Sequence, residues 1–166
     1  MNKIYVISDT HFGHENSLKW TDEEGNKLRP FSTVEELNNT IVNNWNSVVK
    51  NGDHIYHLGD VVIQKQYLDI VKQLNGKKRL VLGNHDIFET KLYLEVGFQK
   101  LCGVRVFPGL KAILTHFPVH PNSLREGWVN VHGHYHSTNL DDNRYINVSV
   151  EQINYTPVLL NDLVNK

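Results

Sequence analysis

The sequence has 166 residues, of which 40% are hydrophobic and 21% are charged, and its formal net charge at pH 7 is -1. A chain of this length buries roughly 70% of its unfolded surface, so we expect one domain over residues 1–166. The near-neutral charge argues against a broad nucleic-acid-binding surface. Cys102 is the only cysteine, which excludes a disulfide framework and a thiolate zinc cluster. No run approaches about 18 apolar residues and no signal peptide is recognisable, so we expect a cytoplasmic protein that does not enter membranes.

In chain order, the first predicted strand covers residues 3–8, which are rich in Ile, Val and Tyr. A long polar segment follows from Phe12 to Phe31, and a connection of that length in a compact domain usually has a function. Residues 32–35 match a capping box, and apolar residues then recur at every third or fourth position up to Val49. This pattern predicts a core-packing helix of about five turns, ended by the Asn51-Gly52 pair.

The middle of the chain alternates between strand-like and helix-like segments. We expect strands at residues 55–58 and 80–82, and helices at about 66–74 and 87–96. After Gly97 the pattern changes to consecutive strands, which suggests a second, more antiparallel sheet packed on the first. These later strands are predicted at residues 104–107, 111–115, 128–132, 145–148 and 157–160.

Five of the predicted strands end in Asp, Asn or His side chains. Because ligands bind at the carboxyl ends of strands in open α/β sheets, we expect these side chains to meet. Oxygen and imidazole donors without thiolates suit Mn, Fe, Zn, Ni or Co. Seven such donors are too many for one tetrahedral zinc, but they fit two divalent metal ions that share a carboxylate. The candidate ligands are Asp9, His11, Asp60, Asn84, His116, His134 and His136.

The charges of this set favour an anionic substrate. Two divalent ions would carry about +4, and the carboxylates of Asp9 and Asp60 would leave about +2, or about +1 with a bridging hydroxide. Two metal ions can supply that hydroxide near neutral pH and neutralise charge on phosphoryl oxygens. His85 follows Asn84 directly and points elsewhere, so it is free to act as general acid for the leaving group. Asp86 would hold the ring of His85 or tie down the turn.

The segments DTH, HLGDV, GNHD, LTH and HGHYH resemble, in order and spacing, the motifs of the calcineurin-like metallophosphoesterases. This resemblance implies an α/β fold, a four-layer α/β/β/α sandwich of two mixed β-sheets flanked by helices, with a dinuclear metal site. It also implies His85 as the general acid. By similarity, one metal would be held by Asp9, His11, Asp60 and His136, and the other by Asp60, Asn84, His116 and His134.

Three further segments resemble a narrower group of small bacterial and phage members that are described only as phosphoesterases. Unlike larger members of the family, the chain has no recognisable cap domain or long insertion. We therefore expect a small phosphate ester as substrate, and manganese as the metal that supports activity in vitro. The three segments are FGHEN at 12–16, RPF at 29–31 and NVSVE at 147–151.

The loop after the first strand leaves at the catalytic end, so we expect part of it to cover the metal ions. Trp20 and Phe31 could stack on a base, and the planar guanidinium of Arg29 suits a phosphate. His14 is a candidate for contact with the substrate or with a metal ligand, and the alternative is a position on a surface loop. These residues favour a small nucleotide-type phosphodiester over a protein phosphoester. An equally weighted alternative is that Trp20 and Phe31 pack the loop and that Arg29 pairs with an acid.

The same motifs are also compatible with functions other than that of a phosphodiesterase. One is a metal-bearing interaction module that uses the same fold without catalysis. Others are a phosphomonoesterase or a nuclease with the same site, although the absence of a basic face weakens the nuclease. Non-catalytic relatives tend to lose ligands, whereas this chain keeps all seven together with His85. The sequence therefore favours an enzyme.

Overall fold

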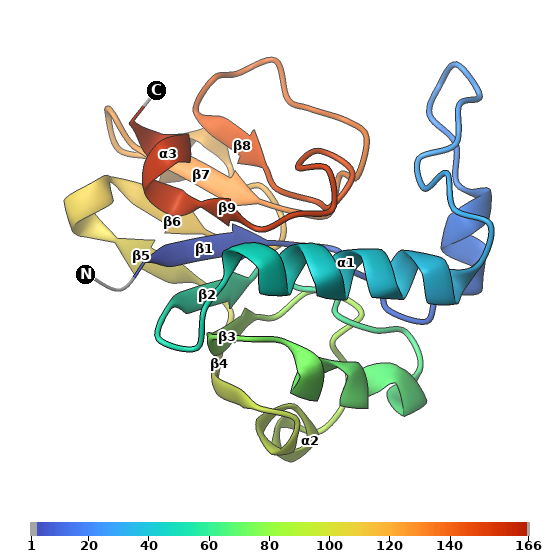
Figure 1. The fold of residues 1–166 in the computed structure, drawn as a ribbon. Coiled ribbons are helices and arrows are strands. Elements are labelled where there is room, and N and C mark those ends of the chain that lie inside the picture. Colours follow the sequence, from blue (N-terminus) through green and yellow to red (C-terminus); the bar gives the residue numbers. More distant parts are fainter. Residues whose placement is uncertain (1–2, 166) are drawn as a thin grey trace.

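The computed structural model describes residues 3–165 as two β-sheets that lie face to face with helices outside them (Figure 1). The first sheet has the strand order β4-β3-β2-β1-β9 and the second has the order β5-β6-β7-β8. The first sheet contains β1 (Ile4–Ile7), β2 (His54–His57), β3 (Lys77–Val81), β4 (Phe98–Cys102) and β9 (Val158–Leu159). The second contains β5 (Arg105–Phe107), β6 (Ala112–Leu114), β7 (Val129–His132) and β8 (Tyr145–Asn147).

Both sheets are mixed, since each has one antiparallel strand at an edge and is otherwise parallel. Strand β9 runs antiparallel to β1, and β5 runs antiparallel to β6. The remaining neighbours, β1 to β4 and β6 to β8, are parallel. The expected α/β class with two mixed sheets and flanking helices is therefore confirmed.

Helices cover the outer face of the first sheet, where α1 lies alongside β1 (Figure 1). The α-helices are α1 (Val34–Val48), α2 (Thr90–Glu95) and α3 (Leu160–Val164). The 3-10 helices cover Glu15–Lys19, Lys65–Gln73, Pro108–Leu110 and Pro121–Ser123. In the described part of the chain, no helix is long and apolar enough to span a bilayer.

The central strands β1 and β2 of the first sheet bury both of their faces. On β1, Tyr5 and Ile7 belong to the core beneath α1, whereas Val6 belongs to the core between the sheets. Successive side chains of a strand point to opposite faces, so an almost continuous apolar run is needed when both faces are covered. On α1, the buried stripe that begins at Leu37 and ends at Trp45 packs on this sheet. The carboxyl ends of the parallel strands are therefore held rigidly.

The predicted helices form, but with different bounds. Helix α1 has 15 residues, about four turns, and ends at Val48, before the expected Asn51-Gly52 stop. Its N-cap is Thr33, whose side chain accepts a hydrogen bond from the backbone N–H of Glu36 at 3.1 Å. Glu36 in turn accepts one from the backbone of Ser32 at 2.9 Å, so the capping interaction lies one residue later than predicted. The helix expected at 66–74 is a 3-10 helix, and the one expected at 87–96 shortens to α2.

The predicted arrangement of the later strands was wrong in two respects. The second sheet is mostly parallel, because the segments 115–128 and 133–144 carry the chain back between β6, β7 and β8 instead of forming hairpins. The last strand, expected in that sheet, is β9 and pairs with β1. Strand β4 was missed because its exposed residues Gln99 and Lys100 hide the strand pattern.

The position of the cap of α1 gives a first test. Thr33→Ala should lower the free energy of unfolding by about 1 kcal/mol, because the N–H of Glu36 loses its acceptor. Ser32→Ala is the matched control, since the backbone N–H of Ser32 that bonds Glu36 is retained, and it should change stability by less than about 0.5 kcal/mol. Urea unfolding of the two variants measures the difference. A larger loss for Ser32→Ala would contradict the assignment.

Candidate metal centre

The candidate ligands lie at the shared carboxyl edge of the two sheets. Asp9, Asp60 and Asn84 follow β1, β2 and β3 of the first sheet, and the four histidine ligands come from the adjoining loops. The two sheets are joined here directly, because the backbone N–H of His134, after β7, donates to Asp9 Oδ2 at 2.9 Å. The structure therefore brings together residues that are up to about 125 positions apart in the chain.

One cluster consists of Asp9, His11 and His136, whose ligand atoms lie within 4.8 Å of one another. The Nε2 atoms of His11 and His136 are each 3.8 Å from Asp9 Oδ1. The other oxygen, Oδ2, accepts hydrogen bonds from His134 N and, at 3.0 Å, from the hydroxyl of Ser149. These bonds fix the carboxylate and leave Oδ1 facing the two imidazoles.

A second cluster consists of Asp60, His116 and His134. His116 donates from Nδ1 to the carbonyl oxygen of Leu58 at 2.8 Å, which leaves Nε2 directed toward the cluster. Asn84 Oδ1 lies 2.9 Å from that Nε2, so the amide joins the same group of atoms. The expected ligand Asn84 is therefore close enough to share a metal ion with His116.

Asp60 lies between the two clusters. Its Oδ1 accepts a hydrogen bond from the backbone N–H of His85 at 2.9 Å. Its Oδ2 is 3.6 Å from Nε2 of His11 in the first cluster and 3.5 Å from Nε2 of His116 in the second. A carboxylate oxygen placed almost equally between donors of both clusters is the arrangement that a bridging ligand requires.

Several buried polar atoms of the first cluster have no hydrogen-bond partner within the described residues: Asp9 Oδ1 and both ring nitrogens of His11. A buried polar atom without a partner costs on the order of 1–3 kcal/mol, and more when it is charged. A divalent cation among these atoms would remove that cost, since carboxylate oxygens and imidazole nitrogens are its ordinary ligands. The residues present therefore fit two divalent metal ions.

Burial sets the protonation of these ligands. It lowers the pKa of His11, and burial together with His116 lowers the pKa of His134, so both rings are neutral at neutral pH. Burial alone would raise the pKa of Asp9, but the histidines around it outweigh burial and keep the pKa below its usual value. Metal ligands must be deprotonated to bind, and this environment keeps Asp9, His11 and His134 deprotonated.

The backbone at five of the seven candidate ligands adopts the left-handed conformation that non-glycine residues rarely occupy. The φ angles are 59° at Asp9, 45° at His11, 59° at Asp60, 70° at His134 and 41° at His136. Each such residue costs energy that the surrounding structure must supply, and this strain gathers at functional sites. The conformation turns the chain sharply beyond each strand and directs several side chains to one point.

Glycines at the strand ends allow the backbone segments to approach closely. A Cβ atom at Gly83 would lie only 2.7 Å from the backbone nitrogen of Asp60 and would overlap its Oδ1. One at Gly133 would overlap the side chains of Ser8 and Asp9. The glycine before Asn84 and the glycine inside HGHYH are therefore needed for the approach of ligands from neighbouring strands.

Arg29 does not face the substrate side of the site, which corrects its prediction as a substrate contact. It is fully buried, and Nε donates to Glu151 Oε1 at 2.7 Å while Nη1 donates to the carbonyl of Thr10 at 3.0 Å. Glu151 Oε1 also lies 3.0 Å from Nδ1 of His136. Arg29 thus positions the carboxylate that orients a ligand, as in carboxylate–histidine–metal arrangements.

No pattern in the sequence predicted a role for Glu151 or Ser149. Both belong to the NVSVE segment, whose resemblance to other phosphoesterases indicates no role for them, and both touch candidate ligands. Burial would raise the pKa of Glu151, but the Arg29 guanidinium and the His136 ring lower it, so the carboxylate is ionised. Its contact with Nδ1 in turn raises the pKa of His136 in spite of burial.

The loop after β1 lies against the first cluster. The ring of Trp20 is 4.7 Å from that of His136 and 5.3 Å from that of His11, and the Arg29 guanidinium lies over it. Phe31 instead packs edge-on against Tyr155, so its expected stacking on a base is wrong. The loop therefore forms one side wall of the candidate metal centre. The sequence predicted that part of this loop covers the metal ions.

His14 lies beside the same wall. Its ring is 5.6 Å from that of His11 and 5.3 Å from that of Trp20. Burial, together with His11 and Arg29, lowers the pKa of His14 to about 4, so the ring is neutral. Its substrate contact stays a prediction.

His85 and Asp86 occupy different environments although they are adjacent. The side chain of His85 is exposed, and its ring lies 5.7 Å from that of His11, above the clusters. The carboxylate of Asp86 is buried and accepts hydrogen bonds from the backbone of Asp60, Val61 and Gly83 at 2.8 to 3.1 Å. Asp86 therefore ties down the turn, the second of its two expected roles.

The fold and the two His/Asp clusters at its edge together define a metallophosphoesterase. Residues 2–166 match the family described as calcineurin-like phosphoesterase, and the chain belongs to that family. It is 40% identical to the uncharacterised protein MJ1445 of Methanocaldococcus jannaschii, over all of this chain and 91% of that protein. It is 33% identical to the gene 66 protein of Mycobacterium phage L5, over 52% of this chain and 41% of that protein.

A solved structure supports the fold over its whole length. The crystal structure of AQ665, a protein of unknown function from Aquifex aeolicus, superposes with a TM-score of 0.73. The two sequences are 28% identical, and the match covers 99% of each chain.

The shared position of Asp60 predicts how metal binding is lost. Asp60→Asn should weaken the binding of both ions, whereas His136→Ala should chiefly weaken one, because only Asp60 reaches donors of both clusters. Elemental analysis of the purified variants measures the stoichiometry. If the unmodified protein binds one ion tightly and shows no second site at millimolar manganese, the two-metal arrangement is wrong.

The contact between Glu151 and His136 generates a separate prediction. Glu151→Gln keeps an acceptor oxygen for Arg29 and His136 but removes the charge, so manganese affinity in the first cluster should fall by about 10- to 100-fold. Glu126→Gln, at an exposed acid, is the control and should leave affinity unchanged. Calorimetric titration with manganese gives both values, and equal affinities would show that Glu151 does not act on the metal ligand.

Proposed function

We propose that this protein is a dinuclear, metal-dependent phosphoesterase that hydrolyses a small nucleotide-type phosphodiester. The observation that carries the proposal is the position of Asp60 Oδ2, 3.6 Å from His11 and 3.5 Å from His116. Two divalent ions held by these clusters would supply a hydroxide near neutral pH and neutralise charge on phosphoryl oxygens. Manganese is the metal we expect to support activity in vitro.

His85 is the group we assign to the leaving alkoxide. Its backbone N–H bonds Asp60 Oδ1, which fixes the start of the side chain beside the shared carboxylate. The ring remains exposed above the clusters, where it can hold a proton at a nitrogen and pass it to an oxygen that departs. Asp86 serves this step indirectly, because it holds the turn that carries His85.

The walls of the site support a small substrate. Trp20 closes the side of the first cluster, and Arg29 is buried behind it. We assign to His14, whose ring is neutral, a hydrogen bond to the substrate. A single domain over residues 1–166 and action in the cytoplasm complete the proposal, and the lone thiol of Cys102 suits a reducing compartment.

A turnover assay separates this function from its alternatives. Bis(p-nitrophenyl) phosphate with added manganese should be hydrolysed faster than p-nitrophenyl phosphate if the enzyme is a diesterase. The reverse preference would make it a phosphomonoesterase. No turnover of either ester by protein that contains two metal ions would favour a non-catalytic interaction module.

The role of His85 predicts a dependence on the leaving group. His85→Ala should lower turnover by about 10²- to 10⁴-fold on diesters with alkoxide leaving groups, and by much less on p-nitrophenyl esters, which need little protonation to depart. Ile87→Ala, two residues further along the same loop and 79% exposed, is the control. An equal loss on both kinds of ester would show that His85 positions the substrate instead.

A further inference from the structure

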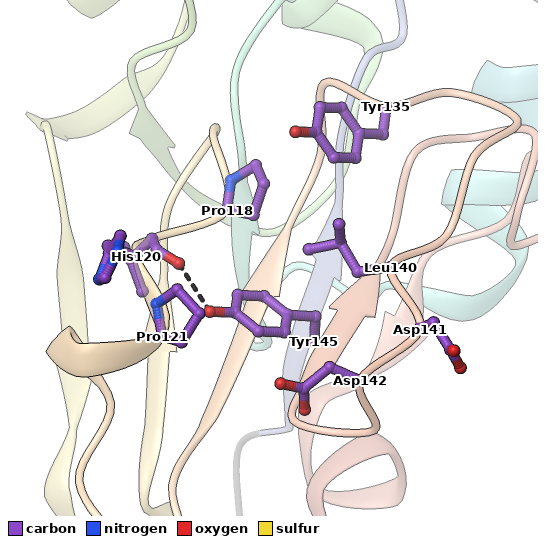
Figure 2. A pocket seen from close by; sticks show the side chains of 9 residues that line it. Pro118, His120, Pro121, Tyr135, Leu140, Asp141, Asp142 and Tyr145 are labelled. Carbon is purple, nitrogen blue, oxygen red and sulfur yellow. Dashed lines mark hydrogen bonds between the residues drawn. The ribbon is translucent and has the colours of Figure 1, made fainter.

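A pocket of about 510 Å³ lies beside the second cluster, between the loops that follow β6 and β7 (Figure 2). Its volume is within the range of pockets that bind small molecules. Tyr135 and Leu140 come from the segment after β7, Tyr145 begins β8, and the facing wall comes from the segment after β6. The residues that matter here are Pro118, Pro121, Tyr135, Leu140 and Tyr145.

The pocket adjoins the metal ligands directly. Tyr135 stands in the chain between His134 and His136, and its ring centre is 5.7 Å from that of His134. On the same side, Phe117 follows His116, and its ring lies 4.4 Å from that of His134. A molecule whose phosphate reaches the clusters would therefore have its neighbouring group at the mouth of this pocket.

The walls are apolar and held in place without a ligand. The hydroxyl of Tyr145 donates to the carbonyl of Val119 at 2.7 Å, which joins the two loops across the pocket (Figure 2). The fully buried ring of His132 supports both tyrosines, at 5.9 Å from Tyr135 and 6.1 Å from Tyr145. A preformed pocket binds its ligand with less loss of conformational entropy.

The pocket leaves large apolar side chains in water. Tyr135 is 36% exposed, Leu140 is 37% exposed, and the adjoining Phe117 is 48% exposed. Contiguous exposed apolar side chains in a soluble protein often mark a ligand-binding groove. Their position next to candidate metal ligands distinguishes them from scattered exposed residues such as Leu94 on α2.

The charges of the pocket disfavour a ligand that carries a second phosphate. Its lining contains no Lys or Arg and includes two acids. Asp142 pairs with Arg144 at 2.6 Å, whereas Asp141 has no ion pair within the described residues. An acidic rim with aromatic and proline walls repels a second phosphate and accepts a neutral flat ring.

We propose that this pocket binds the nucleobase of the phosphodiester while the phosphate lies at the metal centre. This inference rests on the proposed function and deepens it: the substrate is a diester with one neutral nucleoside and no further phosphate on that side. The base then lies beside the second cluster. Trp20, expected to stack on a base, is instead engaged over His136 of the first cluster.

Two chromogenic diesters with the same leaving group test the proposal. The p-nitrophenyl ester of thymidine 5′-phosphate and methyl p-nitrophenyl phosphate differ only in the group that would enter the pocket. The protein with manganese should have a kcat/KM about 5- to 100-fold higher for the thymidine ester, as base–aromatic stacking provides. Tyr135→Ala and Leu140→Ala should each reduce that ratio, and Leu94→Ala should leave it unchanged.

The outcomes separate this inference from the proposed function. Hydrolysis of the methyl ester with no advantage for the thymidine ester, or a ratio that survives in both pocket variants, overturns the pocket alone. If neither ester is hydrolysed, the proposed function fails. NMR measurements of thymidine binding then test independently whether the pocket binds a nucleoside. Loss of that binding in Leu140→Ala supports the pocket, and no binding to the unmodified protein overturns it.

Two controls accompany the assay with the two diesters. Because Tyr135 stands between two candidate ligands, the metal content of Tyr135→Ala is measured, and if that variant loses metal or fails to fold, Leu140→Ala decides. A 3′-phosphate added to the thymidine ester should lower kcat/KM, since the acidic rim repels it. A rise in kcat/KM would overturn the assignment of the pocket to a neutral nucleoside.

Discussion

The shared carboxylate of Asp60 is the interaction on which the rest of the site depends. One oxygen is tied to the backbone of His85, which leaves the other between His11 and His116. His11 belongs to the loop after β1 and His116 to the loop after β6, so a single oxygen faces donors from both sheets. Such a contact tolerates little sliding of one sheet on the other. The core between the sheets, with Val6, Leu114 and Val131 fully buried, supplies the necessary rigidity.

The features that cost the most free energy, strained backbone and buried charge, lie at this same edge of the fold. Asp9, His11 and Asp60 combine left-handed backbone with burial, and two of them carry negative charge in an environment with little water. Buried charge and strained backbone persist only when packing and hydrogen bonds over-determine them. Here Ser149 and Asp86 provide hydrogen bonds, and Arg29 provides a buried positive charge near the first cluster. Packing and hydrogen bonds therefore hold the ligand side chains in an arrangement that suits cations.

The sequence predicted the candidate ligands because each lies within four residues of the end of a strand, and the carboxyl edge of a parallel sheet brings strand ends together. It predicted the α1 stripe for a similar reason, since the pattern from Leu37 to Trp45 is local. It did not predict that β9 pairs with β1, because a two-residue strand carries no signal for its partner. For Arg29 the sequence left two roles open, because a guanidinium suits a phosphate and a buried carboxylate equally, and the structure supports the pairing with an acid. Only the fold showed that Glu151, 122 residues away, is its partner.

The donors of each candidate metal ion come from both sheets, and this has a consequence for the lifetime of the folded state. Asp9 and His11 belong to the first sheet and His136 to the second, so a bound ion would cross-link the halves much as a disulfide cross-links two strands. Unfolding would then have to release ions before the sheets separate, and ligands that bind only the native state stabilise it in proportion to their supply. The cell's pool of divalent ions would thus govern the lifetime of the folded chain.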